Sequence, residues 1–283
     1  MEVLVPSTLG DALDAAAAHP GAALLAGGTD LMVEMNFGRA RPETIVVVQR
    51  LPELRGLERD GRIRARAGVT YTELLGETGA SFAAVREMAR TVGSPQIRNA
   101  GTLGGNLGTS SPAGDALPVL AAFDATIVLR SKRGERRVAF AEYMTGPKKS
   151  VRRPDELVVA AEWDEPGPAQ TFMKVGTRNA MVIAVASLCL VVDRARRAVR
   201  VALGSCGPTI LRATEAERFA AGVVDEAGWE RPLRASDAAL VRFGELVAAA
   251  ARPIDDVRGT AAYRRHVLAV MARRSLARVG GVA

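Results

Sequence analysis

The sequence predicts an α+β protein with two domains. The chain has 283 residues, of which 48% are hydrophobic and 24% charged, the balance of a folded globular protein. Its length exceeds the roughly 100–200 residues of one typical domain. Short apolar strands and helical segments are mixed without the regular alternation of a doubly wound sheet. Pro and Gly interrupt the pattern at 163–170, so we expect domains at 1–165 and 166–283.

A first subdomain is expected at about residues 1–55. Ser7 and Thr8 are good N-cap residues for an Ala-rich helix that runs to about His19. Further elements follow from apolar runs, β-branched runs and glycine breaks. In chain order they are a strand at 22–26, a break at 27–29, a short helix after Asp30 and a strand at 44–48.

A second subdomain is expected at 56–165. Arg62, Arg64 and Arg66 alternate with apolar residues, which predicts a half-buried strand. Residues 93–118 are rich in Gly, Ser, Asn and Pro, so we expect a long, functional loop there. The other expected elements are a helix at 81–91, a helix at 115–123 and a strand at 125–130.

The C-terminal domain is expected to be a smaller α+β unit. Residues 182–192 and 198–203 read as paired strands joined by the charged turn at 193–197. Residues 237–251 and 259–278 have helical patterns. The tail is Arg-rich, and we expect a solvated face or a subunit interface there.

Composition excludes several classes of function. The net charge is +7, but aromatic residues make up only 4%, so platforms for stacking bases are scarce and nucleic-acid binding is not expected. No apolar run approaches the roughly 18 residues of a membrane span. The N-terminus has no basic region of the kind that begins an export signal, so a cytoplasmic location is expected. Two Cys and two His residues cannot supply an iron–sulfur cluster or a zinc cage, so we expect no metal held by this chain.

A first glycine-rich segment, Leu25–Leu31, reads as strand, Gly pair and helix start. Two interpretations fit it. Free backbone N–H groups at such a turn can hold an anion. Alternatively, Gly27 or Gly28 takes a positive φ in a plain strand-to-helix turn.

A second glycine-rich segment spans Gly101–Asp115. Its glycines would let the backbone approach a ligand closely, and its Thr, Asn and Ser side chains are neutral hydrogen-bonding groups. Asp115 stands at the start of the next predicted helix. It either caps that helix or accepts hydrogen bonds from sugar hydroxyls.

Neither segment is a standard nucleotide fingerprint. The sequence has no GxGxxG and no GxxxxGK[ST] motif, so a Rossmann NAD site and a P-loop are both unsupported. Two phosphate-friendly segments in one half of the chain favour a ligand with two phosphates. The residues alone thus predict a dinucleotide-sized cofactor.

Long ordered motifs carry a family resemblance. AGGTDL at 26–31 and QIRNAGTLGGNLGTSSPAGDALPVLAAFDA at 96–125 resemble the FAD-binding medium subunit of the molybdenum hydroxylases, the family of xanthine dehydrogenase and carbon monoxide dehydrogenase. The resemblance continues through FMKVGTR from 172, ALGSCGPTILRATEAE from 202 and PIDDVRGTAAYRRHVLAVMARRSL from 253. It covers nearly the whole chain.

The resemblance implies a fold and a set of FAD contacts. The fold would be a PCMH-like N-terminal region of two subdomains, with the FAD pyrophosphate between them, followed by the C-terminal domain. Asp115 matches the family's acidic residue at the ribityl or ribose hydroxyls, Val158 an aliphatic residue against the ring system, and Lys174 a lysine that approaches the ring. The pyrophosphate would be lined by Leu25, Ala26, Gly27, Gly28, Thr29, Asp30 and Leu31 on one side, and by Thr102, Leu103, Gly104, Gly105, Asn106 and Thr109 on the other.

The resemblance also implies a division of labour. A large partner subunit would carry the molybdenum cofactor and hydroxylate the substrate, and a small one would carry two [2Fe–2S] clusters. This chain would take electrons from those clusters and pass them from FAD to an external acceptor, in a heterotrimer that dimerises. The alternative is a scaffold or binding subunit that keeps the fold without redox-active flavin.

Overall fold

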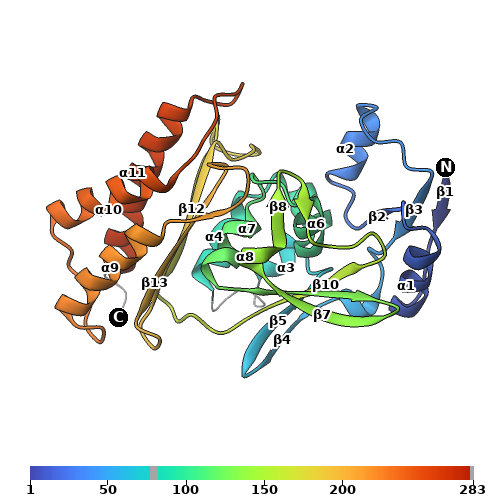
Figure 1. Cartoon of the computed structure of the whole chain (residues 1–283), viewed down its shortest axis with the longest axis horizontal. Coiled ribbons are helices and arrows are strands. Elements are labelled where there is room, and N and C mark those ends of the chain that lie inside the picture. The colour runs from blue at the N-terminus through green and yellow to red at the C-terminus, as the bar shows by residue number, and fades with distance from the viewer. Residues whose placement is uncertain (77–81, 281–283) are drawn as a thin grey trace.

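The structure is a computed structural model that describes residues 1–76 and 82–280. It confirms the α+β class. Figure 1 shows three regions side by side, with the N-terminal subdomain at one end, a central subdomain in the middle and the C-terminal domain at the other end. Three separate sheets of three, five and four strands underlie these regions.

The N-terminal subdomain contains a small parallel sheet with strand order β1-β3-β2. Of the two candidate caps, Thr8 caps the first helix: its hydroxyl accepts from the N–H of Asp11 at 3.1 Å, and the Asp11 carboxylate accepts from the N–H of Thr8. The predicted elements of this region are all confirmed to within a residue or two. They are α1 (Leu9–Ala18), β2 (Ala23–Leu25), α2 (Leu31–Asn36) and β3 (Thr44–Val47), and the strand β1 (Glu2–Leu4) was not predicted.

The central subdomain is an antiparallel sheet of order β4-β5-β10-β6-β7, with helices packed against it. The central strand, β10 (Leu157–Trp163), was not predicted, because all its residues are buried and it lacks the alternation that marks a half-exposed strand. The other strands are β4 (Leu57–Asp60), β5 (Arg62–Arg66), β6 (Thr126–Ser131) and β7 (Gly134–Ala139), and the small pair β8 (Met144–Gly146) and β9 (Lys149–Ser150) lies beside them. The helices are the 3₁₀ turn η1 (Pro52–Leu54), α3 (Tyr71–Leu75), α4 (Ala83–Thr91), α5 (Pro95–Ala100), α6 (Leu103–Thr109), α7 (Ala116–Ala122) and α8 (Phe140–Tyr143).

The prediction of a long loop at 93–118 was wrong, because α5 and α6 lie within it. Each begins at a hydroxyl cap: Ser94 Oγ accepts from the N–H of Ile97 at 3.4 Å, and Thr102 Oγ1 accepts from the N–H of Gly105 at 2.9 Å. Glycine disfavours a helix intrinsically, but tertiary packing overrides that preference here. The predicted helix at 81–91 is confirmed from Ala83, and Ser81 lies outside the described residues.

The C-terminal domain is an antiparallel sheet of order β11-β12-β13-β14. Helices α9–α11 cover one face of this sheet. Helices α4 and α7 of the central subdomain lie against its other face (Figure 1). The paired strands are confirmed, although the first begins at Ala186 rather than at 182. The helix at 214–227 was not predicted. The elements are β11 (Gln170–Val175), β12 (Ala186–Asp193), β13 (Ala198–Gly204), β14 (Leu211–Arg212), α9 (Thr214–Ala227), α10 (Asp237–Ala250) and α11 (Ala261–Gly280).

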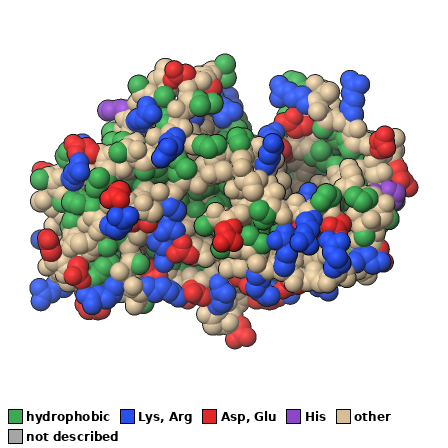
Figure 2. Space-filling model, viewed as in Figure 1, with side chains coloured by type: hydrophobic (Ala, Val, Ile, Leu, Met, Phe, Trp, Pro, Cys, Tyr) green, Lys and Arg blue, Asp and Glu red, His purple; other side chains and the backbone are tan. Residues whose placement is uncertain are grey.

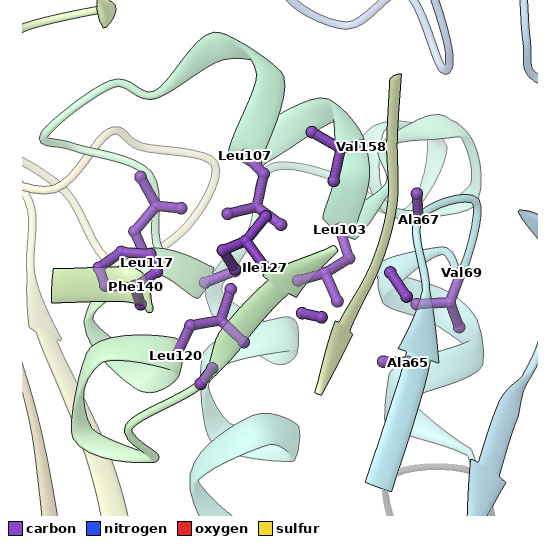
Figure 3. Packing of buried hydrophobic residues seen from close by; sticks show 14 of the residues in the cluster. Ala65, Ala67, Val69, Leu103, Leu107, Leu117, Leu120, Ile127, Phe140 and Val158 are labelled. Carbon is purple, nitrogen blue, oxygen red and sulfur yellow. The ribbon is translucent and has the colours of Figure 1, made fainter. Parts of the chain in front are cut away.

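Two apolar cores hold these layers together, one under the central sheet and one between the C-terminal sheet and its helices. Figure 3 shows the first core, with Leu103 and Leu107 of α6 pointing toward Ile127. Among the described residues, no helix is both long enough and apolar enough to span a bilayer. Cys189 and Cys206 are buried, and burial raises the pKa of both thiols, that of Cys206 to about 12.

Candidate functional site

A cavity of about 700 Å³ lies between the N-terminal and central subdomains and reaches the C-terminal domain. Figure 2 shows the molecule hollowed between these regions. The cavity brings together both glycine-rich segments, the start of β10 and Lys174 near the end of β11. The predicted site residues that line it are Leu25, Ala26, Gly27, Gly28, Thr29, Asp30, Leu31, Thr102, Gly104, Gly105, Asn106, Thr109, Asp115, Val158 and Lys174.

Leu103 does not line the cavity. Its side chain is 3% exposed and packs in the core beneath α6 (Figure 3), and its N–H donates to the carbonyl of Val69 at 3.0 Å. A helix turns each successive side chain by about 100°, so the residue between Thr102 and Gly104 faces inward. Val158 belongs to the same core and also lines the cavity.

The first glycine-rich segment presents unpaired backbone donors. Within the described residues, the N–H groups of Gly27 to Leu31 have no hydrogen-bond acceptor. Both glycines are also needed by the fold: a Cβ on Gly27 would lie 1.8 Å from the carbonyl oxygen of Ala100, and Gly28 has a φ of +71°. The turn and the anion-binding interpretations are therefore compatible, since the same glycine turn presents these unpaired donors.

The second segment differs, because α6 uses its own N-terminal amides. The N–H of Gly104 donates to the carbonyl of Ala67 at 2.7 Å, and that of Gly105 to Thr102 Oγ1. Thr109 Oγ1 donates to Asp30 Oδ2 at 3.2 Å, which joins the two walls of the cavity. This segment therefore contributes side chains and space to the cavity rather than free N-terminal amides.

Among the side chains of this segment, Asn106 gives the clearest indication of a bound ligand. Its Oδ1 is buried and has no hydrogen-bond partner among the described residues. A Cβ on Gly114 would lie 2.8 Å from both the Oδ1 and the Nδ2 of Asn106, so Gly114 makes room for this amide. A buried polar atom that the protein leaves unsatisfied beside a cavity indicates a bound partner.

Asp115 forms a buried ion pair with Lys174. The Nζ of Lys174 lies 2.5 Å from Asp115 Oδ2 and also donates to the carbonyl of Thr91 at 3.0 Å, and the two ionic side chains are 5% and 8% exposed. Asp115 makes no capping hydrogen bond to α7, so the capping interpretation was wrong. Its Oδ1 is buried without a partner in the described chain. Burial raises the pKa of Asp115 to about 6, against the opposing effect of Lys174.

The structure adds lining residues that sequence reasoning missed. Tyr71, Val92 and Ile97 provide apolar surface from the central subdomain, and 181–183 provides it from the C-terminal domain. Met181 and Ile183 are 54% and 50% exposed, an unusual apolar exposure beside a cavity. The sequence carries no signal for 181–183 at the cavity, because residues 182 and 183 were predicted to be part of a paired strand that in fact begins at Ala186. Lys148, Arg152 and Glu34 supply further charge at the lining.

Arg98, which precedes the second segment, has a local structural role. Its Nη1 donates to the carbonyls of Val92 and Gly93 at 3.1 and 3.0 Å, and so holds the backbone ahead of α5. Asn99 accepts a hydrogen bond from Thr72 Oγ1 at 2.6 Å. Neither lies against the cavity.

The residues fit a flavin dinucleotide. Ligand cavities span about 300–1,000 Å³ and combine apolar surface with a few placed polar groups. This cavity has unpaired backbone donors in the first segment, unpaired acceptors on Asn106 and Asp115, and apolar surface toward the C-terminal domain. Donors suit phosphate oxygens, and acceptors suit sugar or ribityl hydroxyls.

Comparisons with known proteins agree with this fit. Residues 1–162 match the family model of the FAD binding domain in molybdopterin dehydrogenase, and 171–279 match that of the CO dehydrogenase flavoprotein C-terminal domain. The chain is 33% identical over 225 residues to a putative xanthine dehydrogenase FAD-binding subunit of Escherichia coli, with 76% of this chain and 77% of that protein covered. It is 29% identical to the carbon monoxide dehydrogenase medium chain of Hydrogenophaga pseudoflava, with 90% and 88% covered.

A solved structure extends the likeness to the fold. Reconstituted CO dehydrogenase from Oligotropha carboxidovorans superposes with a TM-score of 0.88 at 26% identity, covering 100% of this chain and 98% of that one. Fold and cavity therefore define a flavoprotein component of an oxidoreductase. More narrowly, the chain belongs to the family of FAD-binding subunits of xanthine and CO dehydrogenase-type molybdenum hydroxylases. Nothing in the cavity favours a scaffold that has lost the flavin.

Proposed function

We propose that this chain is the electron-transfer subunit of a molybdenum hydroxylase complex. It takes electrons from [2Fe–2S] clusters of a small partner subunit and passes them to an external acceptor, while a large partner carries the molybdenum cofactor and hydroxylates the substrate. The complex is a cytoplasmic dimer of heterotrimers. The observation that carries the proposal is the single cavity region where unpaired donors, unpaired acceptors and apolar surface from all three regions meet.

In this proposal FAD lies in the cavity, with its diphosphate against 27–31 and its hydroxyls toward Asn106 and Asp115. Bound FAD supplies the chemistry of accepting and releasing electrons. Residues 1–165 form the FAD-binding domain, divided near 55, and 166–283 form the C-terminal domain. The family matches to 1–162 and 171–279 support this division. The proposed contacts are the predicted residues that line the cavity, without the side chain of Leu103.

Lys174 and Asp115 have distinct parts in this site. Lys174 comes from β11, so the C-terminal domain delivers a positive charge into the cavity. A cation close to the flavin ring would favour its negatively charged reduced form. Asp115 holds that cation in place and keeps Oδ1 for a hydroxyl of the ligand.

The test is anaerobic mixing of the reduced iron–sulfur subunit, isolated from the native complex, with the FAD-loaded chain. The proposal predicts that the flavin absorbance band bleaches as the clusters reoxidise. A matched sample with the chain stripped of FAD should leave the clusters reduced. If the loaded chain also leaves them reduced while binding its partner, the electron-transfer role is wrong.

A further inference from the structure

The cavity has a charge imbalance that the proposed contacts leave unexplained. Its basic lining residues are Lys148, Arg152 and Lys174. Lys148 pairs with Glu34 at 2.8 Å, and Lys174 pairs with Asp115 at 2.5 Å. Arg152 has no carboxylate partner within the described residues, so it is the lining cation whose charge the protein does not neutralise there.

Arg152 is held in place by neutral groups. Its Nη1 donates to the carbonyls of Arg153, Pro154 and Glu156, the last at 2.7 Å. These carbonyls belong to the turn that leads into β10, whose first residues, Leu157 and Val158, line the cavity. The remaining guanidinium nitrogens make no hydrogen bond in the described structure. A half-buried guanidinium fixed on one side and unpaired on the other is prepared for an anion.

The other lining residues of the cavity indicate which anion Arg152 would meet. The first segment offers backbone N–H groups and the Thr29 hydroxyl but no cation, and the first 38 residues contain no Lys or Arg. Asp30, whose carboxylate accepts a hydrogen bond from Thr109, adds negative charge at this wall. A ligand diphosphate beside this wall therefore lacks a cation from the N-terminal subdomain, and Arg152 of the central subdomain is the lining cation left without a carboxylate among the described residues.

We propose that Arg152 is a positioning residue that compensates the diphosphate charge and sets the preference of the cavity for FAD over uncharged riboflavin. This rests on the proposed function, since it assumes that FAD occupies the cavity. Arg153 is the matched control: it carries the same charge one residue along, is exposed and does not line the cavity.

The test measures dissociation constants of FAD and riboflavin for the full chain freed of flavin. Arg152→Gln should weaken FAD binding by roughly tenfold to a hundredfold, the range for losing a charge-assisted hydrogen bond. Riboflavin binding should change less than about twofold, because that ligand carries no phosphate. Arg153→Gln should leave both constants at the wild-type values. Arg152→Lys should recover much of the FAD affinity, because it restores the charge.

Three results overturn the inference. One is equal FAD affinity in Arg152→Gln and Arg153→Gln. Another is a loss of riboflavin affinity as large as that for FAD, which would mean that Arg152 only holds the turn before β10. The third is FAD binding by Arg152→Lys that is as weak as binding by Arg152→Gln, which would show that the charge of Arg152 does not determine the affinity. Failure of the wild-type chain to bind FAD would instead contradict the proposed function.

Discussion

The two glycine-rich segments look alike in the sequence but differ in what they offer a ligand. The first, at 25–31, ends its strand in a turn whose N–H groups have no acceptor within the described residues. The second contains α6, whose first amides are bonded to Ala67, Val69 and Thr102. One segment therefore supplies donors from the backbone, and the other supplies Asn106, Asp115 and space.

The difference shows that glycine content in a sequence does not reveal whether a glycine makes room for neighbouring protein backbone or for a ligand. Gly27 and Gly104 are required by neighbouring protein backbone: a Cβ would lie 1.8 Å from Ala100 O in one case and 2.7 Å from Ala67 O in the other. At Gly105, the nearest contacts of a Cβ are Thr102 Oγ1 at 3.0 Å and Ala26 Cβ at 4.0 Å. Of these three, only Gly105 has its open side toward the cavity.

The largest expected effect is a difference in stability and FAD binding between valine substitutions at the adjacent glycines Gly104 and Gly105. Gly104→Val should lower the free energy of unfolding by about 3 kcal/mol, because its Cβ meets Ala67 at 2.5 Å and the helix must shift. Gly105→Val should change it by about 1 kcal/mol or less but abolish FAD binding, since the added methyl groups occupy the cavity. Urea denaturation and FAD titration of both variants check this. Equal stability losses would contradict the assignment of the two glycines.

Asp115 should make FAD binding pH-dependent. Its pKa is about 6 in the free protein, and a ligand hydroxyl that donates to Oδ1 favours the carboxylate and lowers that pKa. Binding then releases a proton, so the affinity is full above pH 6 and falls, by up to about tenfold per pH unit, as pH decreases below 6. Titrations between pH 5 and pH 8, with Asp115→Asn as the variant expected to flatten the profile, test this. A wild-type profile as flat as that of the variant would exclude the linkage.

Asn106→Ala should weaken FAD binding by roughly tenfold, the value of one hydrogen bond to a buried acceptor. Stability without ligand should be unchanged or slightly higher, because the substitution removes a buried oxygen that has no partner in the described chain. Thermal unfolding with and without FAD separates the two effects. A large loss of stability without FAD would show that Asn106 supports the fold.

The smallest effect is expected for the Glu34–Lys148 pair, which joins α2 to the turn before β9 across the cavity mouth. The side chains are 24% and 51% exposed, so the coupling should change FAD affinity by less than about fivefold and should decrease with salt. A double-mutant cycle of Glu34→Gln and Lys148→Met on FAD affinity measures it. A coupling above about thirtyfold in FAD affinity would indicate that this pair closes the cavity.

The sequence predicted the elements whose local signals agree with their environment. The cap at Thr8 and the alternation in Arg62–Arg66 each fixed an element correctly. It could not reveal β10, since a strand buried on both faces has no alternation, or α6, whose glycines are tolerated only because the helix packs closely on Ala67.

The same limit applies to the site. Asn106, Asp115 and both glycine-rich segments were found from residue types and positions, and Lys174 was placed by family resemblance. The ion pair of Asp115 and Lys174 joins the residue before α7 to β11, far apart in the chain, so no spacing pattern could show it. Arg152 was missed because its significance depends on the carboxylates that pair with the other lining cations.

The most direct test of the central claim is the identity of the flavin that the purified chain binds. The absorbance spectrum is recorded, and acid-released cofactor is identified by mass, before and after incubation with FAD. The account predicts one FAD per chain, held between the two glycine-rich segments and lost in Gly105→Val. Release of FMN, or a folded chain that stays colourless with added FAD both alone and with its partner subunits, would contradict it.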